Sequence, residues 1–188
     1  MNFTDKLKQK ENCIWALGFS TILCIVIGLF FDYYYDLNDD VLMKDILAGV
    51  YTGTPEGNNI QMLVPISFVI SLFYRIVGII PWYGVFFQLC HFGSIYLITN
   101  RLLGFFEKRT AKLTAVLLET VAIVTLLLKD LVFVQYTITC TLLASAAAFL
   151  FYTSDSNVSV KQFFKNNLLS IILVTVAFCI RSEMLILV

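Results

Sequence analysis

The stretch CIWALGFSTILCIVIGLFF, residues 13–31, decides the class of this protein. It contains no charged residue, and it is long enough for a helix that crosses the roughly 30 Å hydrocarbon core of a bilayer. The bilayer offers no water to backbone N–H and C=O groups, so a crossing segment must pair them within its own helix. A signal peptide is the alternative, but the run is long for one and no small-residue cleavage site follows it. We therefore predict a transmembrane helix.

The composition of the whole chain agrees with a bilayer as its solvent. Of the 188 residues, 59% are hydrophobic and 14% are charged, which is more apolar side chain than a soluble domain of this size can enclose. Thirteen basic and thirteen acidic residues give a net charge of zero. Since there is no basic excess, we expect no nucleic-acid partner. The five cysteines stand singly in apolar runs, which predicts neither a disulfide framework nor a zinc site.

Four further apolar runs predict transmembrane helices, so the expected fold is an all-α, polytopic transmembrane helix bundle of about five spans. These runs are residues 81–99, 113–128, 131–152 and about 163–180. No internal repeat and no soluble domain is visible, so we treat residues 1–188 as a single transmembrane domain. The chain ends inside an apolar run, and we expect it to be the N-terminal part of a longer module.

The run MLVPISFVISLFYRIVGII, residues 62–80, is ambiguous, because Pro65 interrupts its start and Arg75 lies inside it. If this run does not cross, nine of the thirteen basic residues lie on the side of the N-terminus. Short cytoplasmic loops carry an excess of Lys and Arg, so we place that side in the cytoplasm. Residues 62–74 are then an interfacial helix, with Arg75 reaching towards lipid headgroups. Residues 32–80 become one extracytoplasmic loop with short helices.

The predicted outer loop gathers acidic residues. The stretch DLNDDVLMKDILAGVYTGTPEGNN, residues 36–59, contains Asp36, Asp39, Asp40, Asp45 and Glu56. Capping of a short helix by Asn38, Asp39 or Asp40 explains one or two of these acids. It does not explain four carboxylates between positions 32 and 40, which repel one another unless a cation, a proton or a ligand is bound. A capping role and a functional site both stay open on the residues alone.

The order of these features resembles the N-terminal part of the GT-C superfamily, the polytopic glycosyltransferases that use polyprenyl-phosphate-linked sugars. The paired acids of the family's dolichyl-phosphate-mannose type correspond to Asp39 and Asp40, directly after the first span. The segment YTGTPEGNNIQMLVPISFVISLFYRI, residues 51–76, is similar to the family's loop and juxtamembrane helix. The segment CIRSEMLIL, residues 179–187, resembles an Arg-containing segment of the family. The second acid is often Glu in that type, and the family usually has more spans.

The resemblance implies a membrane glycosyltransferase that moves a sugar from a lipid phosphate to an acceptor on the extracytoplasmic side. Such transfer needs a carboxylate that takes the acceptor's proton, for which we expect Asp39, and cations that hold the leaving phosphate. Asp40 is then a substrate-orienting residue or, with Asp39, half of a Mg²⁺ or Mn²⁺ site. Arg181 is the expected phosphate ligand, because its planar donors match phosphate oxygens. The further expected substrate-binding residues are Arg75, Lys129 and Glu56.

The expected partners are the lipid bilayer, a polyprenyl-phosphate sugar donor and an unidentified acceptor, and the expected location is a bacterial plasma membrane with the N-terminus in the cytoplasm. Two other classes stay open. A transporter or flippase component would carry its ionisable site near the midplane, between repeats, and a non-catalytic assembly subunit would leave the clustered acids unexplained. Pairing with Glu183 or with lipid headgroups is the alternative role for Arg181.

Polar residues inside the predicted spans give two further expectations. His91 and Glu119 lie at similar predicted depth in neighbouring spans, so we expect them to contact each other. Gln135, Tyr136, Thr137 and Thr139 lie near the predicted outer end of the 131–152 run. They are expected either to line a polar cavity or to bond back to their own helix.

Overall fold

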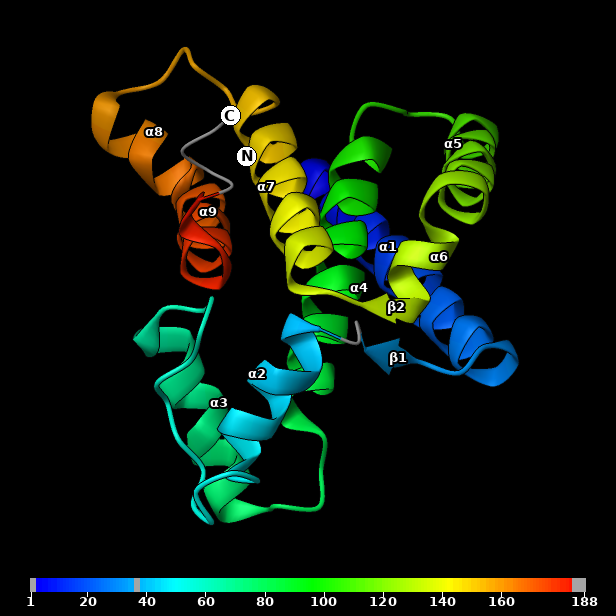
Figure 1. Cartoon of the computed structure of the whole chain (residues 1–188). Helices are drawn as coiled ribbons and strands as arrows, with labels where there is room; N and C mark the ends of the chain where they lie inside the picture. The colour runs from blue at the N-terminus through cyan, green and yellow to red at the C-terminus, as the bar shows by residue number, and fades with distance from the viewer. Residues whose placement is uncertain (1–2, 36–37, 184–188) are drawn as a thin grey trace.

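The computed structural model describes residues 3–35 and 38–183, which are predominantly helical (Figure 1). The helices are α1 (Phe3–Phe30), α2 (Asp39–Ala48), α3 (Val64–Ile76), α4 (Trp82–Leu103), α5 (Arg109–Ala122), the π-helical η1 (Ile123–Leu127), α6 (Leu128–Val132), α7 (Tyr136–Tyr152), α8 (Val160–Asn166) and α9 (Leu168–Ile180). Two short strands, β1 (Tyr34–Tyr35) and β2 (Phe133–Val134), pair in parallel. The predicted helical class is confirmed. The structure also contains a short parallel strand pair of two residues in each strand, which was not predicted.

Two of the described helices are long and apolar enough to cross a bilayer by length and composition. They are residues 7–30 of α1 and the continuous helix formed by α5, η1 and α6, residues 109–132. The pair α8 and α9, bent by 54° at Asn167, is a third candidate if it forms one span. Two to three of the five expected spans are therefore supported in the described part of the chain.

The outward faces of these helices are apolar. Ile22 of α1 is 63% exposed, Leu126 of η1 is 73% exposed and Leu168 of α9 is 55% exposed, each with large apolar neighbours on the same helix. Soluble monomers rarely expose apolar surface of this extent. The surface is compatible with a membrane protein, as the composition predicts.

The expected span over residues 131–152 is wrong in its first part. Leu131 and Val132 end α6, and α7 begins only at Tyr136. The intervening β2 pairs with β1, with Tyr34 opposite Phe133 and Tyr35 opposite Val134. A partner that is distant in sequence therefore supplies backbone hydrogen bonds at this break, and apolar periodicity cannot reveal such a partner. Residues 129 and 130, which separate the two predicted runs, form no turn, because both lie inside α6.

Two apolar clusters hold the helices together, and α4 and α7 contribute to both. The first cluster joins α2, α3, α4, α7 and α9, and contains Met43, Ile70, Phe87, Leu143 and Ile180. The second joins α1, α4, η1, α6 and α7, and contains Ile27, Ile95, Ile123, Leu131 and Leu142. In Figure 1, α4 and α7 accordingly occupy the middle of the molecule, with α9 on one side and α5 on the other.

The acidic segment and most of the basic residues lie at opposite ends of the bundle, as hydrogen bonds between helix ends show. At one end, here called the acidic end, the N–H of Leu63 donates to the carbonyl of Cys179 (2.7 Å), and the N–H of Tyr83 donates to the Tyr74 hydroxyl (3.1 Å). These bonds hold the start and the last turn of α3 at the same end of the bundle. This short helix therefore does not run the length of the bundle, in agreement with an interfacial position.

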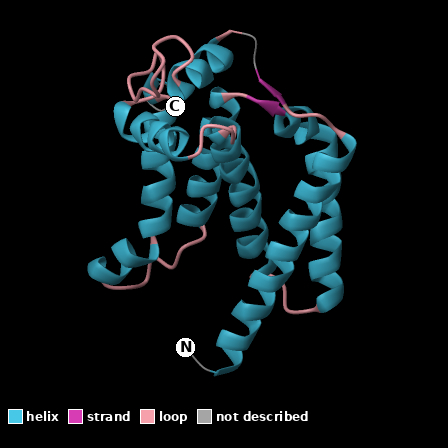
Figure 2. Cartoon of the chain, turned by 90° about the horizontal axis from the view of Figure 1, so that it is seen from below, coloured by secondary structure: helices cyan, strands magenta, loops and turns pink. Residues whose placement is uncertain are grey.

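The opposite end, here called the basic end, carries the start of α1 and the loops after α4 and α7. There Arg101 Nε donates to Thr153 Oγ1 (2.7 Å), and Lys8 pairs with Glu107 (3.4 Å). Figure 2 shows the strand pair at one end of the helices and the N-terminus at the other. The two ends therefore present different charged groups to their surroundings.

Candidate functional site

Helix α2 carries the paired acids as its first two residues. It ends at Ala48 because Gly49 adopts a left-handed conformation (φ 79°), and the Gly49 N–H bonds back to the carbonyl of Ile46 (3.0 Å). Glycine is required there, since a Cβ at position 49 would lie 2.4 Å from the backbone of Thr54. The glycine lets the loop after α2 fold back against the helix.

Asp40 is fully buried, with 0% of its surface exposed. Its Oδ1 accepts hydrogen bonds from the hydroxyl of Tyr83 (2.5 Å) and from the backbone N–H of Tyr136 (3.0 Å). These donors lie in the first turns of α4 and α7, so the carboxylate ties α2 to both helices and satisfies a free amide at the start of α7. This burial favours an orienting role for Asp40 over direct contact with a substrate.

Asp39 is only partly buried, and its Oδ2 accepts a hydrogen bond from the hydroxyl of Tyr136 (3.1 Å). No bond to Oδ1 is present among residues 3–35 and 38–183. A partly buried carboxylate that is fixed through one oxygen suits a general base. The N-cap residue Asn38 makes no side-chain bond to the helix, whereas Asp39 and Asp40 lie in its first turn, where a carboxylate stabilises the helix dipole.

Arg181 directly follows α9 and meets the same tyrosine. Its guanidinium carbon lies 5.0 Å from the centre of the Tyr136 ring, and Nη1 donates to the hydroxyl of Thr137. The described residues contain no ion pair between Arg181 and Glu183, so that alternative is not supported. The buried Nε has no hydrogen-bond partner within the described residues. This Nε is therefore a buried donor that lacks an acceptor in the described structure.

Tyr136 is the centre of the cluster that we call the tyrosine site, which consists of Asp39, Asp40, Tyr83, Tyr136 and Arg181. The hydroxyl of Tyr136 contacts one carboxylate, its N–H contacts the other, and its ring lies beside the guanidinium. Three residues predicted to act together, from the start of α2 and the end of α9, are thus brought to one place. Tyr136 was expected only as a cavity residue, and Tyr83 was not anticipated.

The other predicted substrate-binding residues lie outside the tyrosine site. Arg75 donates through Nε and Nη2 to the carbonyl of Pro55 (3.2 and 2.8 Å), so it holds the loop after α2 instead of reaching for headgroups as expected. The backbone N–H of Glu56 bonds to Ile46 (3.4 Å), which fixes the same loop. Lys129 is exposed on α6, and within the described residues it makes no ion pair with an acid. Asp36 lies outside the described residues.

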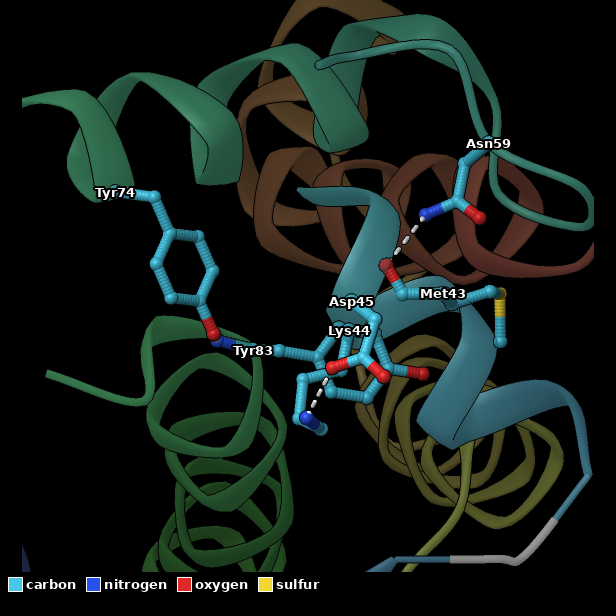
Figure 3. A network of polar contacts seen from close by, with 6 residues as sticks. All are labelled: Met43, Lys44, Asp45, Asn59, Tyr74 and Tyr83. Carbon is cyan, nitrogen blue, oxygen red and sulfur yellow. Dashed lines mark hydrogen bonds and ion pairs between the residues drawn. The ribbon is translucent and has the colours of Figure 1, made fainter. Parts of the chain in front are cut away.

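Helix α3 supports the site through Tyr74. Figure 3 shows this side chain reaching from α3 to the backbone of Tyr83 at the start of α4, next to the ion pair between Lys44 and Asp45 (2.5 Å). Burial raises the pKa of the Tyr74 phenol, and the carboxylate of Asp45 adds to this effect, while the Tyr83 N–H opposes it. The phenol is therefore a neutral hydrogen-bonding group at physiological pH.

The expected contact between His91 and Glu119 is wrong. His91 Nε2 lies 2.7 Å from the hydroxyl of Thr139 on α7, and Glu119 Oε1 accepts from the hydroxyl of Thr99 on α4 (2.7 Å). Thr99 is about 12 Å along the helix from His91 at 1.5 Å per residue. The depth was misjudged because the helix that contains Glu119 continues to Val132 instead of ending at the last apolar residue of the run.

An apolar groove of about 560 Å³ opens beside the tyrosine site, between α1, α4 and the strand pair. It is lined by residues that include Cys24, Tyr33, Tyr35, Gly84 and Phe92. Tyr35 connects it to the site, since its ring lies 5.9 Å from that of Tyr83. A second groove of about 330 Å³ shares Cys24 and Phe92 and continues along α1 and α4 as far as Leu17. Together they form a long apolar surface.

The two expected metal ligands, Asp39 and Asp40, differ in how much of each carboxylate a metal ion could reach. Within the described ranges no group of three or more His, Cys, Asp or Glu side chains is placed to hold an ion. Of the two expected ligands, Asp40 is enclosed and already bonded, which leaves the Oδ1 of Asp39. An ion at this position would need its remaining ligands from a substrate.

Comparison with known proteins adds no assignment: no protein-family model, no curated protein and no solved structure matches this chain. The interpretation of the tyrosine site therefore depends on its geometry.

Proposed function

We propose that this chain is the N-terminal part of an integral-membrane glycosyltransferase of the GT-C type, which transfers a sugar from a polyprenyl-phosphate donor to an acceptor at the acidic end. The observation that carries the proposal is the placement of Asp39 and Arg181 around Tyr136. Asp39 supplies a carboxylate oxygen and Arg181 supplies N–H donors. Both lie at one end of a helix bundle whose outer surface is apolar. Lipid-phosphate glycosyl transfer requires both groups.

The proposed reaction is a single displacement. Asp39 accepts the proton of the acceptor hydroxyl while that oxygen forms a bond to the anomeric carbon. The bond between this carbon and the phosphate oxygen breaks, and the electron pair leaves with the polyprenyl phosphate, whose charge Arg181 stabilises. Displacement at one carbon inverts its configuration. Tyr136 and Asp40 position the two reacting side chains.

The groove between α1 and α4 supports a lipid-linked donor. A polyprenyl phosphate places its phosphate at the membrane surface and its chain in the hydrocarbon. The groove begins at Tyr35, beside the tyrosine site, and follows α1 and α4 away from it. A donor with its chain in this groove would have its phosphate at the acidic end.

The membrane arrangement is part of the proposal. We propose about five spans, with the basic end in the cytoplasm, residues 32–80 outside, and a bacterial plasma membrane as the location. The support is the gathering of Lys8, Arg101 and Arg109 at the basic end, because Lys and Arg are enriched in short cytoplasmic loops. We keep Mg²⁺ or Mn²⁺ only as an ion shared between Asp39 and the donor phosphate.

The test is transfer of radiolabelled sugar from polyprenyl phosphate by membranes from cells that express the complete gene. Replacing Asp39 by Asn keeps the shape of the side chain and removes the base, so incorporation should fall by about 100-fold or more. The matched control is Asp32→Asn, which removes an exposed carboxylate outside the tyrosine site. Equal incorporation by Asp39→Asn and wild type would remove Asp39 from the base role.

A transporter or flippase component is the second candidate, and Glu119 is the observation in its favour. This residue lies within the long apolar helix, one turn before its π-helical segment, and its Oε2 is buried without a partner among the described residues. Ionisable groups and π-helical turns in membrane helices often mark functional sites. Lipid or ion flux into proteoliposomes that is abolished by Glu119→Gln, together with absent sugar transfer, would favour this class.

A further inference from the structure

A polar pocket of about 380 Å³ lies at the basic end, away from the tyrosine site. Its walls come from the start of α1, the end of α4, the end of α7 with the loop after it, and the junction of α8 and α9. The volume falls within the range of small-ligand pockets. None of its residues takes part in the function proposed above.

Two opposite charges line this pocket without neutralising each other. Arg101 is held by the bond from its Nε to Thr153 (2.7 Å), and within the described residues no other side chain bonds its terminal nitrogens. Asp155 accepts the N–H of Asn157 at Oδ1 (2.9 Å). No ion pair joins Arg101 to Asp155 in the described part of the chain. Both charges are therefore available to a ligand.

Three other basic side chains at this end are engaged elsewhere. Lys8 pairs with Glu107, Lys112 donates to Asn12 (2.5 Å), and the guanidinium of Arg109 lies 5.4 Å from the ring of Trp15. Among the described residues that line the pocket, the charged ones are Arg101 and Asp155, so their formal charges balance. A zwitterion matches this balance better than a simple anion does.

The position and the neutral lining of the pocket favour a lipid headgroup. Thr153 and Arg101 follow closely on apolar helical segments, at the level where headgroups meet the helix ends. The lining also contains Ser154 and Asn166, which can form hydrogen bonds, and Leu169, which can contact the apolar part of a lipid.

We propose that this pocket binds the headgroup of phosphatidylethanolamine. Arg101 donates hydrogen bonds to the phosphate, and Asp155 accepts a hydrogen bond from the ammonium group. Phosphatidylcholine lacks the ammonium N–H donors, and phosphatidylglycerol lacks the positive charge. The pocket should therefore distinguish ethanolamine from both.

The experiment is native mass spectrometry of the detergent-solubilised chain, titrated separately with the three lipids carrying identical acyl chains. Wild type should retain phosphatidylethanolamine about ten-fold better than the other two, the ratio that one charge-assisted hydrogen bond typically provides. Asp155→Asn should remove this preference while keeping phosphate-dependent binding. Arg101→Gln should lower retention of all three lipids. Excess free phosphoethanolamine should displace the lipid if the headgroup alone is recognised, and retention unaffected by it would overturn headgroup recognition.

The matched control is Lys161→Gln, which removes a positive charge near the basic end without touching the pocket and should leave retention unchanged. Thr153→Val removes the bond that fixes Arg101 but keeps the charge, so it should reduce retention by only about three-fold. If Arg101→Gln aggregates, the lipid retention of Asp155→Asn and Thr153→Val tests the proposal without it. Equal retention of ethanolamine and choline lipids by wild type, or wild-type preference in Asp155→Asn, would overturn the proposal.

Discussion

The tyrosine site and the surface ion pair between Lys8 and Glu107 use charged residues differently. At the basic end the ion pair between Lys8 and Glu107 lies on the surface, with side chains 59% and 87% exposed, and such pairs contribute little to stability. At the acidic end Asp40 is enclosed, and Asp39 and Arg181 share a tyrosine without forming an ion pair with each other among the described residues. Holding opposite charges close together but unpaired leaves both free for a ligand, which is typical of a site and not of a solvated surface.

The largest expected effect is a loss of sugar transfer on substitution at the acidic end but not at the basic end. Arg181→Gln should lower sugar transfer by about 100- to 1,000-fold, because it removes the charge that stabilises the leaving phosphate. Lys8→Gln, the matched change at the basic end, should leave transfer unchanged. The measurement is initial rate in the radiolabelled assay with matched protein amounts. Similar rates for both variants would mean that the guanidinium is structural.

The second effect concerns stability. Asp40→Ala should lower the free energy of unfolding by about 2–4 kcal/mol, because it leaves the Tyr83 hydroxyl and the Tyr136 N–H buried without their acceptor. Asp32→Ala, at an exposed position, should change it by less than about 0.5 kcal/mol. Denaturation in mixed micelles, followed by circular dichroism, measures both. Equal stability of the two variants would contradict the positioning role of Asp40.

The smallest effect is a dependence on alkaline pH. The pKa of Tyr74 is raised above its ordinary value of 10.0, mainly by burial. The folded state therefore holds this proton more tightly than the unfolded state, and the resulting stability is complete below pH 10 and lost as pH rises through the folded pKa. Tyr74→Phe should make the unfolding free energy less dependent on pH above 10. An unchanged slope in that variant would show that other groups control alkaline unfolding.

Sequence patterns predicted the parts of this molecule that depend on apolar content. The helical class followed from the apolar runs. The grouping of Asp39, Asp40 and Arg181 was expected from the resemblance, and all three contact Tyr136 in the structure. A resemblance of this kind indicates which residues act together without any knowledge of side-chain packing.

The remaining features depend on contacts between distant segments. Tyr83 lies at a predicted membrane boundary, where an aromatic residue usually needs no special role, so its bond to Asp40 could not be anticipated. Arg75 donates a hydrogen bond to the backbone carbonyl of Pro55, in the loop after α2. The folded shape of this loop cannot be deduced from the sequence. The predicted contact between His91 and Glu119 was wrong because the depth of Glu119 was counted from the end of an apolar run at residue 128. The helix continues beyond that residue to Val132.

The ladder of β1 and β2 has a mechanical consequence. Tyr35 and Val134 stand opposite each other shortly before Asp39 and Tyr136, the two residues whose hydrogen bond fixes the carboxylate. The ladder joins the segment that follows α1 to the segment that precedes α7. If α1 spans a bilayer, a change in bilayer thickness changes its tilt, and we expect that change to reach the region of Asp39 and Tyr136 through this ladder.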